Sequence, residues 1–394
     1  MLDKKALTVL FGALFLAMLG VGIIIPNIAY HAADHAASPL QISLLFTVYS
    51  LMQFIFAPVW GHLSDRHGRK PILLLGLLGS GISLIAFGLA DHLWLLFLAR
   101  ALAGLMSSAV LPTAMAYVAD VTDESGRGRG MGLMGAAMGL GFIFGPGIGG
   151  LLARFGHDTP FFVSGALSLL NCAMAAFALR ESNAPQEAVT KSRMAAPWRA
   201  FQSPLLPFYW VAFCVPFAMA ALETTFPLFI QDRFGYGAFE MGWMFLFMGT
   251  AVALVQGVLL GRLIQRYGEE RVLRFGLMVN AAGFLMVIAA GGWKSLTAAL
   301  LVAGVGNQVM RPTNASLISK RTAHGQGVSI GMMDSFDSLG RIIGPLLAGS
   351  LYGGSAVSPY LAAAAMLLLC RLTLWSSPSR SAAGARGAAP PAGP

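Results

Sequence analysis

Charged residues are scarce in this chain of 394 residues. Only 11% of them are charged and 56% are hydrophobic, whereas ordinary soluble domains have roughly 25% charged residues. Apolar runs recur along the whole length, so one buried core cannot absorb them. Residues 6–30 form the first run, which as a helix would be about 37 Å long and would cross a ~30 Å hydrocarbon core with some tilt. The scarcity of charge therefore excludes a soluble globular protein and indicates a membrane protein.

That first run could instead be a cleaved signal peptide, because Lys4 and Lys5 give it a basic start. A signal peptide has a shorter apolar region of about 7–15 residues, and here similar runs follow the first one. We therefore expect a membrane span.

Cysteine and histidine are also rare. The three cysteines lie in or at the edge of apolar runs, and no spacing suggests a disulfide framework or a metal site. They read as small core residues. None of the seven histidines lies deep in an expected span, so we expect no histidine proton relay. Without a nucleophile–base pair or a ligand cluster, an intramembrane enzyme is disfavoured, and we expect no metal and no cofactor.

The apolar runs predict an all-α polytopic membrane protein with 12 transmembrane helices. We expect spans near 6–30, 40–60, 71–90, 93–119, 130–152 and 159–179, and then near 206–230, 238–260, 271–291, 294–318, 325–351 and 357–376. The polar, proline-containing stretch between the two sets indicates a linker, and the Ala/Gly/Pro-rich end indicates a disordered tail. The predicted division is residues 1–182 for the first six-helix bundle, 183–204 for a cytoplasmic linker, 205–376 for the second bundle and 377–394 for the tail.

Positive charge is distributed unevenly across the expected loops. If the N-terminus is cytoplasmic, 20 of the 26 lysines and arginines lie on that side, three lie outside and three lie within spans. This asymmetry is typical of membrane orientation, and it explains the net charge of +9 without a nucleic-acid partner. We expect both termini in the cytoplasm.

The chain contains an internal duplication. GHLSDRHGRK (61–70) matches GRLIQRYGEE (261–270), and GLMSSAVLPTA (104–114) matches GVGNQVMRPTN (304–314), both at an offset of 200. GFIFGPGIGG (141–150) matches GRIIGPLLAG (340–349) at 199. Three matches in order predict two pseudo-symmetric six-helix halves in the same orientation. Such folds place the substrate path between the halves and work by rocking one against the other, which disfavours a channel.

These motifs resemble those of the major facilitator superfamily. GHLSDRHGRK resembles its signature loop between spans two and three, Arg100 with Gly104 resembles its span-four motif, and GFIFGPGIGG resembles the Gly-Pro motif of its drug/proton antiporters. The likeness extends from GVGIIIP (20–26) to the eleventh span and is greatest to bacterial multidrug and tetracycline exporters.

This resemblance implies the fold of that superfamily and proton-coupled efflux of amphipathic, cationic drugs across the bacterial inner membrane. The implied partners are a small-molecule substrate, protons and the lipid bilayer, with a monomeric protein and the proton gradient as energy source. An exporter of a neutral metabolite such as a sugar or amino acid is the alternative.

Two groups of motif residues receive expected roles from this resemblance. Asp65 and Arg69 would latch the two bundles on the cytoplasmic side, with Asp120 as a partner of Arg69. The full expected gate is Gly61, Asp65, Arg66, Gly68, Arg69 and Asp120. The alternative is a basic turn that only sets topology. Small residues let helices approach closely, so we expect helix packing at Gly141, Gly145, Pro146, Gly149, Gly344 and Pro345.

The segment GMMDSFDSLGRIIGPLLAG (331–349) places Asp334, Asp337 and Arg341 within the eleventh span. Each charge at the centre of a span costs about 2.5–3.5 kcal/mol on insertion scales, so such residues are candidate functional groups. Spacings of three and four put them on one helix face, which we expect to face the space between the halves. Asp337 and Arg341 can pair, so the two acids differ in electrostatic surroundings and one can exchange a proton near neutral pH. A static ion-pair cluster is the alternative.

The other intramembrane charges are Glu223, Arg100 and Arg311. In the exporters that this chain resembles, a Glu at the matching place in span seven helps to bind cations and couple protons, and the span-four Arg takes part in proton relay. Arg311 could pair with Glu223 or with the span-eleven acids.

The chain departs from those exporters at Gln308 and Ala17, where the multidrug and tetracycline exporters respectively have Asp. A second coupling acid is therefore expected at Asp334 or Asp337. The residues that could line the cavity are Asn27, Tyr49, Gln53, Phe142, Phe226 and Gln308. For the aromatic residues among them, helix packing or contact with lipid is an alternative of at least equal weight.

Overall fold

The computed structural model describes residues 4–182, 203–322 and 326–375, and this part of the chain is helical without strands. The first half contains α1 (Lys4–Asp34), α2 (Pro39–His67), α3 (Arg69–Gly88), α4 (Leu93–Ser107), α5 (Val110–Val121), α6 (Glu124–Leu152), the 3-10 turn η1 (Ala153–Phe155) and α7 (Thr159–Ala178). The second half contains α8 (Leu206–Thr224), α9 (Phe226–Phe234), α10 (Ala238–Leu254), the π-helical turn η3 (Val255–Leu259), α11 (Leu260–Tyr267), α12 (Glu269–Ala289), α13 (Trp293–Arg321), α14 (Gln326–Tyr352) and α15 (Ser358–Trp375).

These helices form the 12 expected spans of an all-α membrane protein. Three spans are interrupted: α4 continues into α5, α8 into α9, and α10 through η3 into α11. Among the described residues, nine segments are long and apolar enough to cross a membrane by themselves. Of the other three spans, α13 and α14 carry the intramembrane charges described below, and α15 is shorter.

Most helix ends lie within a few residues of the expected spans, but the second and eighth spans are longer than predicted. We expected them to end near residues 60 and 260, and the helices continue to His67 and Tyr267. Hydropathy marks only the part of a helix that lies in hydrocarbon, whereas these two helices extend into the polar region beyond it.

The duplicated loop motif makes the same turn in both halves. Gly68 between α2 and α3 has φ 100°, and Gly268 between α11 and α12 has φ 80°. Only glycine adopts such positive φ values without steric cost. The two halves therefore repeat a backbone conformation as well as a sequence.

The Gly-Pro motif of α6 lies where this helix touches α1. A methyl group on Gly145 would be 2.6 Å from the Cα of Gly22, closer than real contacts allow. In the second half, a methyl group on Gly344 of α14 would lie 2.9 Å from the Cα of Phe217 in α8. Equivalent helix pairs therefore pack with their backbones in near contact.

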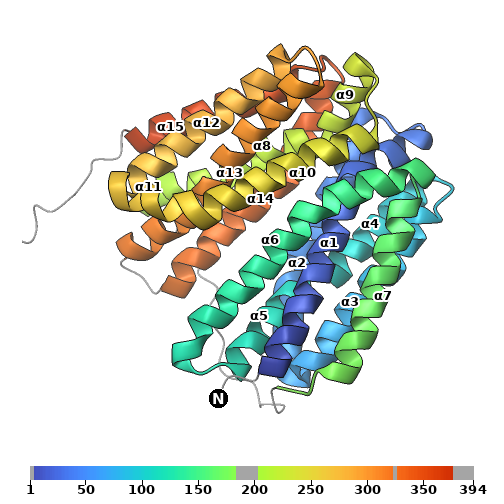
Figure 1. Ribbon diagram of the computed structural model, residues 1–394, viewed down its shortest axis with the longest axis vertical. Coiled ribbons are helices and arrows are strands. Elements are labelled where there is room, and N and C mark those ends of the chain that lie inside the picture. The colour runs from blue at the N-terminus through green and yellow to red at the C-terminus, as the bar shows by residue number, and fades with distance from the viewer. Residues whose placement is uncertain (1–3, 183–202, 323–325, 376–394) are drawn as a thin grey trace, which may run out of the picture.

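The two halves converge at one end and diverge at the other (Figure 1). At the converging end, a Cβ at Gly150 of α6 would lie 2.9 Å from the Cα of Gly242 in α10, and Thr47 of α2 donates a hydrogen bond to the carbonyl of Ile342 in α14. At the diverging end, the same helices carry glycines with no atom within 4 Å of a built Cβ, including Gly61, Gly128, Gly132, Gly135, Gly139 and Gly331. The space between the halves is therefore open at the end that carries the loop at residues 61–70.

The expected linker and tail lie almost entirely outside the described residues, which stop at 182, resume at 203 and end at 375. The division into residues 1–182, 183–204, 205–376 and 377–394 remains a prediction.

Candidate functional site

The charged residues of α14 lie on one face of that helix and form two ion pairs. Arg341 Nε is 2.8 Å from Asp337 Oδ2, one helical turn away. Arg311 of α13 places Nη2 3.4 Å from Asp334 Oδ1. The structure thus pairs the tenth and eleventh spans through opposite charges, one of the two arrangements expected for Arg311.

Three of these four side chains are about half exposed. The exposed fractions are 59% for Arg311, 53% for Asp334 and 46% for Arg341, whereas Asp337 is 16% exposed. Charged groups this uncovered cannot face hydrocarbon at reasonable cost. They therefore face the open space between the halves.

Glu223 of α8 belongs to the same group. Its side chain is half-buried and lies within electrostatic range of Arg341 and Asp337. We call Asp334, Arg311, Asp337, Arg341 and Glu223 the charge ladder. Its members come from three helices of the second half, and acids alternate with arginines along it.

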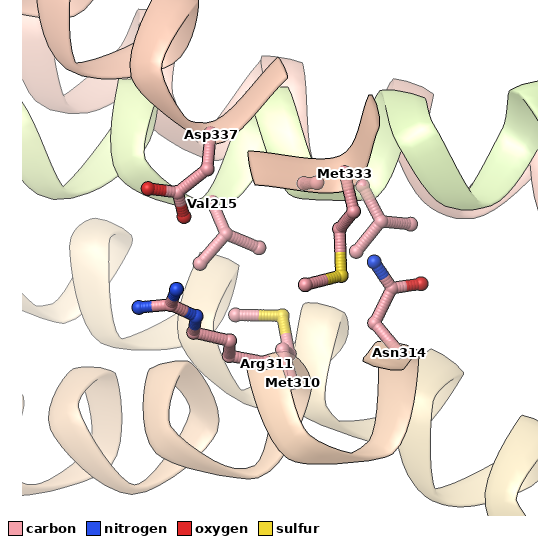
Figure 2. A pocket seen from close by; sticks show the side chains of 8 residues that line it. Val215, Met310, Arg311, Asn314, Met333 and Asp337 are labelled. Carbon is pink, nitrogen blue, oxygen red and sulfur yellow. The ribbon is translucent and has the colours of Figure 1, made fainter. Parts of the chain in front are cut away.

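A small pocket opens beside the charge ladder between α8, α13 and α14. Figure 2 shows Arg311 and Asp337 on opposite walls near one end of this pocket, and Asn314 near the other. The remaining lining is apolar and comprises Val211, Ala212, Val215, Met310 and Met333. The pocket thus combines an apolar interior with one cationic and one anionic group at the same end.

Arg100 of α4 lies in the first half in a different environment. It is 4% exposed, and its guanidinium carbon is 4.2 Å from the ring centroid of Tyr49. Within the described residues no carboxylate lies within ion-pair distance of Arg100. Its positive charge is thus stabilised by a cation–π contact and by a hydrogen bond that Nε donates to the carbonyl of Leu45 at 3.5 Å. A role in proton relay stays a prediction.

Tyr49 is also the centre of a polar cluster in the first half. Its hydroxyl accepts hydrogen bonds from Gln53 Nε2 at 3.0 Å and from Ser107 Oγ at 3.0 Å. Tyr49 also lies within electrostatic range of Arg341 in the second half. This residue therefore brings the first half close to the charge ladder.

Two of the residues expected to line the cavity do not do so. Asn27 is 0% exposed, and its Nδ2 donates to the carbonyl of Ile23 at 2.7 Å within α1. Phe226 is also 0% exposed and contacts the ring of Phe245. Both expectations are corrected: Asn27 is enclosed by protein, with its Nδ2 bonded inside its own helix and its Oδ1 without a hydrogen-bond partner among the described residues, and Phe226 belongs to the core.

The other four expected lining residues, Tyr49, Gln53, Phe142 and Gln308, are half-buried. Gln308 accepts a hydrogen bond from Gln256 Nε2 at 3.0 Å. A place at the edge of the open space is compatible with their exposure, and their role stays a prediction.

The signature-loop charges form a compact cluster. Arg69 is 2.5 Å from Asp65 and, through Nε, 3.0 Å from Asp120. The partner expected for Arg69 is thus the one observed. Every contact that the structure describes for this cluster lies within the first half, because the halves diverge here. In this conformation it is therefore not a latch between bundles, and a latch role in another conformation stays a prediction. Arg66 is exposed and Gly61 faces open space.

Sequence reasoning missed Glu181, which follows α7. Its carboxylate accepts hydrogen bonds from the backbone N–H of Arg69 at 2.7 Å and of Lys70 at 3.1 Å. The N–H groups at the start of a helix have no carbonyl partner within the helix, so Glu181 supplies one for α3. Its negative charge also interacts favourably with the positive end of the helix dipole. Two sequence features could have indicated this contact. An acid directly follows the sixth span, and the start of the third span has no acid in its first turn.

The second half contains a counterpart with opposite charges. Glu269 at the start of α12 accepts hydrogen bonds from Lys320 at 2.8 Å and from Ser316 at 2.5 Å, and Glu270 pairs with Arg321 at 2.8 Å. The duplication of the loop motif was visible in the sequence, but these pairs were not anticipated.

Comparison with known proteins agrees with the geometry. The family model described as Major Facilitator Superfamily matches residues 10–259 and 250–392. Multidrug resistance protein 1 of Bacillus subtilis (strain 168) is 30% identical over 386 residues, covering 96% of this chain and 98% of that protein. The class C tetracycline resistance protein of Escherichia coli is 32% identical over 393 residues, covering 94% and 96%.

A solved structure shows the same fold. It is the crystal structure of a bacterial homolog to the human lysosomal transporter Spinster, in an inward-facing and unoccupied conformation. The TM-score is 0.76 at 14% identity, with 95% of this chain and 97% of that chain covered.

Proposed function

Because the chain belongs to the major facilitator superfamily, we propose that it is a proton-coupled exporter of amphipathic drugs or related small molecules, working by alternating access. The observation that carries the proposal is the charge ladder, which exposes acids and arginines to the open space between the two halves. The full-length similarity to a multidrug and a tetracycline resistance protein supports the choice of substrate class.

The charge ladder has the groups that proton coupling requires. A carboxylate exchanges protons with solvent where water reaches it, and Asp334 and Asp337 lie beside the open space. Each acid has an arginine partner, so loss of its negative charge frees that arginine. Asp334, Asp337 and Glu223 are the candidate proton carriers, and Arg311 and Arg341 are the groups that respond to their charge. Arg100 is a candidate relay residue. The energy source is the proton gradient, and no cofactor takes part.

The open end of the structure supports the assignment of this conformation as inward-facing. The open end carries the loop at residues 61–70, and the excess of lysine and arginine supports placing this end in the cytoplasm. Substrate would therefore enter from the cytoplasm or the inner leaflet, and opening of the converging end would release it outside. We place the protein in the bacterial inner membrane, as a monomer with both termini in the cytoplasm.

The test uses purified full-length protein in liposomes that carry a pH gradient. Lipophilic cations such as tetraphenylphosphonium are added, and internal pH is followed with a trapped dye. We expect each transported compound to release the pH gradient in a protein-dependent manner. Absence of proton movement with every amphipath, together with flux of a neutral sugar or amino acid, would refute the proposal in favour of a neutral-metabolite exporter.

A further inference from the structure

The eighth span contains a turn that its counterpart in the first half lacks. η3 (Val255–Leu259) is π-helical and lies between α10 and α11, whereas the equivalent residues 55–59 belong to the uninterrupted α-helix α2. The duplicated fold therefore does not require this turn. Single π-helical turns inside α-helices occur frequently at functional sites, so the side chains of η3 are candidates for a function that the second half alone performs.

One side chain of η3, Gln256, is joined to Gln308 of α13. Gln256 Nε2 donates hydrogen bonds to Gln308 Oε1 at 3.0 Å and to the backbone carbonyl of Gln308 at 3.4 Å. At the offset of 200 the first half has Phe56 and Ser108 instead, so it contains no equivalent contact. We call Gln256 and Gln308 the amide pair.

The amide pair lies on the wall of the open space between the halves. Gln308 is three residues before Arg311, a spacing that puts both on one face of α13, and Arg311 is 59% exposed to that space. Gln256 is exposed, and a Cβ built at the neighbouring Gly257 has no atom within 4 Å. An amide is costly to place in hydrocarbon, so the exposed side of Gln256 faces water.

The amide pair keeps hydrogen-bonding capacity for a ligand. Each glutamine amide has an oxygen that accepts and a nitrogen that carries two N–H donors. The bond within the pair uses the nitrogen of Gln256 and the oxygen of Gln308. Within the described residues, the oxygen of Gln256 and the nitrogen of Gln308 have no hydrogen-bond partner. One acceptor and one donor group therefore remain on two adjacent side chains.

These two groups select for an uncharged ligand group that donates and accepts. A carboxamide or a urea complements both, because its N–H can bond to the oxygen of Gln256 while its carbonyl bonds to the nitrogen of Gln308. A ketone, ester or ether only accepts, so it leaves the oxygen of Gln256 without a partner. The charge ladder nearby serves charged groups, and the amide pair adds a neutral contact to it.

We propose that the amide pair is a subsite for substrates that carry a carboxamide or a similar neutral group with a donor beside an acceptor. The proposal rests on the proposed export function and deepens it. The cationic part of an amphipath faces the acids of the charge ladder, and its carboxamide bonds to Gln256 and Gln308. Among amphipathic cations of equal charge and size, the protein therefore prefers those that carry such a group.

The test measures binding of two isosteric probes to the purified full chain in lipid nanodiscs, by isothermal titration calorimetry with empty nanodiscs as the background. Both probes are tetraphenylphosphonium ions with one substituted ring. The first carries a carboxamide, and the second carries an acetyl group, which has a methyl in place of the amino group. We expect the carboxamide probe to bind about fivefold more tightly, as one additional neutral hydrogen bond contributes.

Variants assign this preference to each side chain. Gln256→Leu should reduce the preference to less than about twofold and leave the acetyl probe unchanged, because only the carboxamide uses the oxygen of Gln256. Gln256→Glu keeps an acceptor there and should retain the preference. Gln308→Leu should weaken both probes, since both carbonyls lose their donor. Gln265→Leu, at an exposed position of α11, is the matched control and should change neither.

Equal affinity of the wild type for the two probes would overturn the proposal. A preference that persists in Gln256→Leu would do the same, because the N–H of the carboxamide would then bond elsewhere. If both probes bind equally and both drive proton movement in liposomes, the proposed export function stands and the subsite is refuted. Failure of both probes to bind, with no proton movement for any amphipath, would refute both proposals.

Discussion

A single methyl group at the contact between α6 and α10 should shift the protein away from the inward-facing state. A Cβ at Gly150 would lie 2.6 Å from the carbonyl oxygen of Ala238 and 2.9 Å from the Cα of Gly242. Both neighbours are backbone atoms, so they cannot move aside without displacing a helix. Gly150→Ala should therefore push the two halves apart at the converging end.

The magnitude follows from the cost of overpacking. Extra methyl or methylene groups in a well-packed contact typically cost 1–3 kcal/mol. The higher helix propensity of alanine acts in both conformations, so it cancels in the equilibrium between them. If this cost applies only to the inward-facing state, the ratio of outward-facing to inward-facing molecules rises by about 5–150-fold. A small outward-facing population in the wild type should thus become readily detectable.

The measurement is the distance between spin labels at His67→Cys and Tyr267→Cys, determined by pulsed electron paramagnetic resonance in lipid nanodiscs. These positions end α2 and α11 at the diverging end, so their separation shortens when that end closes. Gly139→Ala is the matched control, because Gly139 lies on the same helix with nothing within 4 Å of a built Cβ. Identical distance distributions for Gly150→Ala and the control would contradict the assignment of this contact as the one that holds the inward-facing state.

Two further variants test the other clusters. Asp334→Asn should abolish substrate-driven proton movement in liposomes while the protein still purifies as a folded monodisperse species, and normal pumping would reduce the charge ladder to a structural ion-pair group. Glu181→Ala should lower the free energy of unfolding by about 1 kcal/mol, as loss of a helix cap does, measured as a lower thermal midpoint in detergent. Asp91→Asn, at an exposed loop position, is the control for both, and a Glu181→Ala midpoint equal to that of Asp91→Asn would refute the capping role.

The fold was accessible from sequence because the membrane restricts the alternatives so strongly. A span must satisfy its backbone hydrogen bonds internally and expose apolar side chains to lipid, so hydropathy alone located the 12 helices. Even α13 and α14, whose charges weaken the apolar signal, were predicted from their apolar runs. What hydropathy could not locate was the end of a helix beyond hydrocarbon, as at His67 and Tyr267.

The site was predictable only where helical spacing determines which residues lie together. The spacings of three and four put Asp334, Asp337 and Arg341 on one face of α14, and a face with three charges cannot contact lipid. Which partner each charge would choose depends on helix packing, and the sequence left Arg311 with several candidates. Asn27 shows the opposite failure, since a polar residue in a span suggests a cavity until its bond to the carbonyl of Ile23 is seen.

The duplicated turn also shows how the two halves have diverged in what stabilises them. At the equivalent helix starts, the first half has Arg69 and Lys70 whereas the second has Glu269 and Glu270. The helix dipole favours acids at this position, so α12 supplies its own and binds Lys320 and Arg321 of α13. The start of α3 carries two positive charges, which the helix dipole disfavours, and the carboxylate that binds its N–H groups comes from Glu181. The first half is therefore incomplete without the residues that directly follow its sixth span, and a bundle truncated at Ala178 should be less stable than one that ends at Ser182.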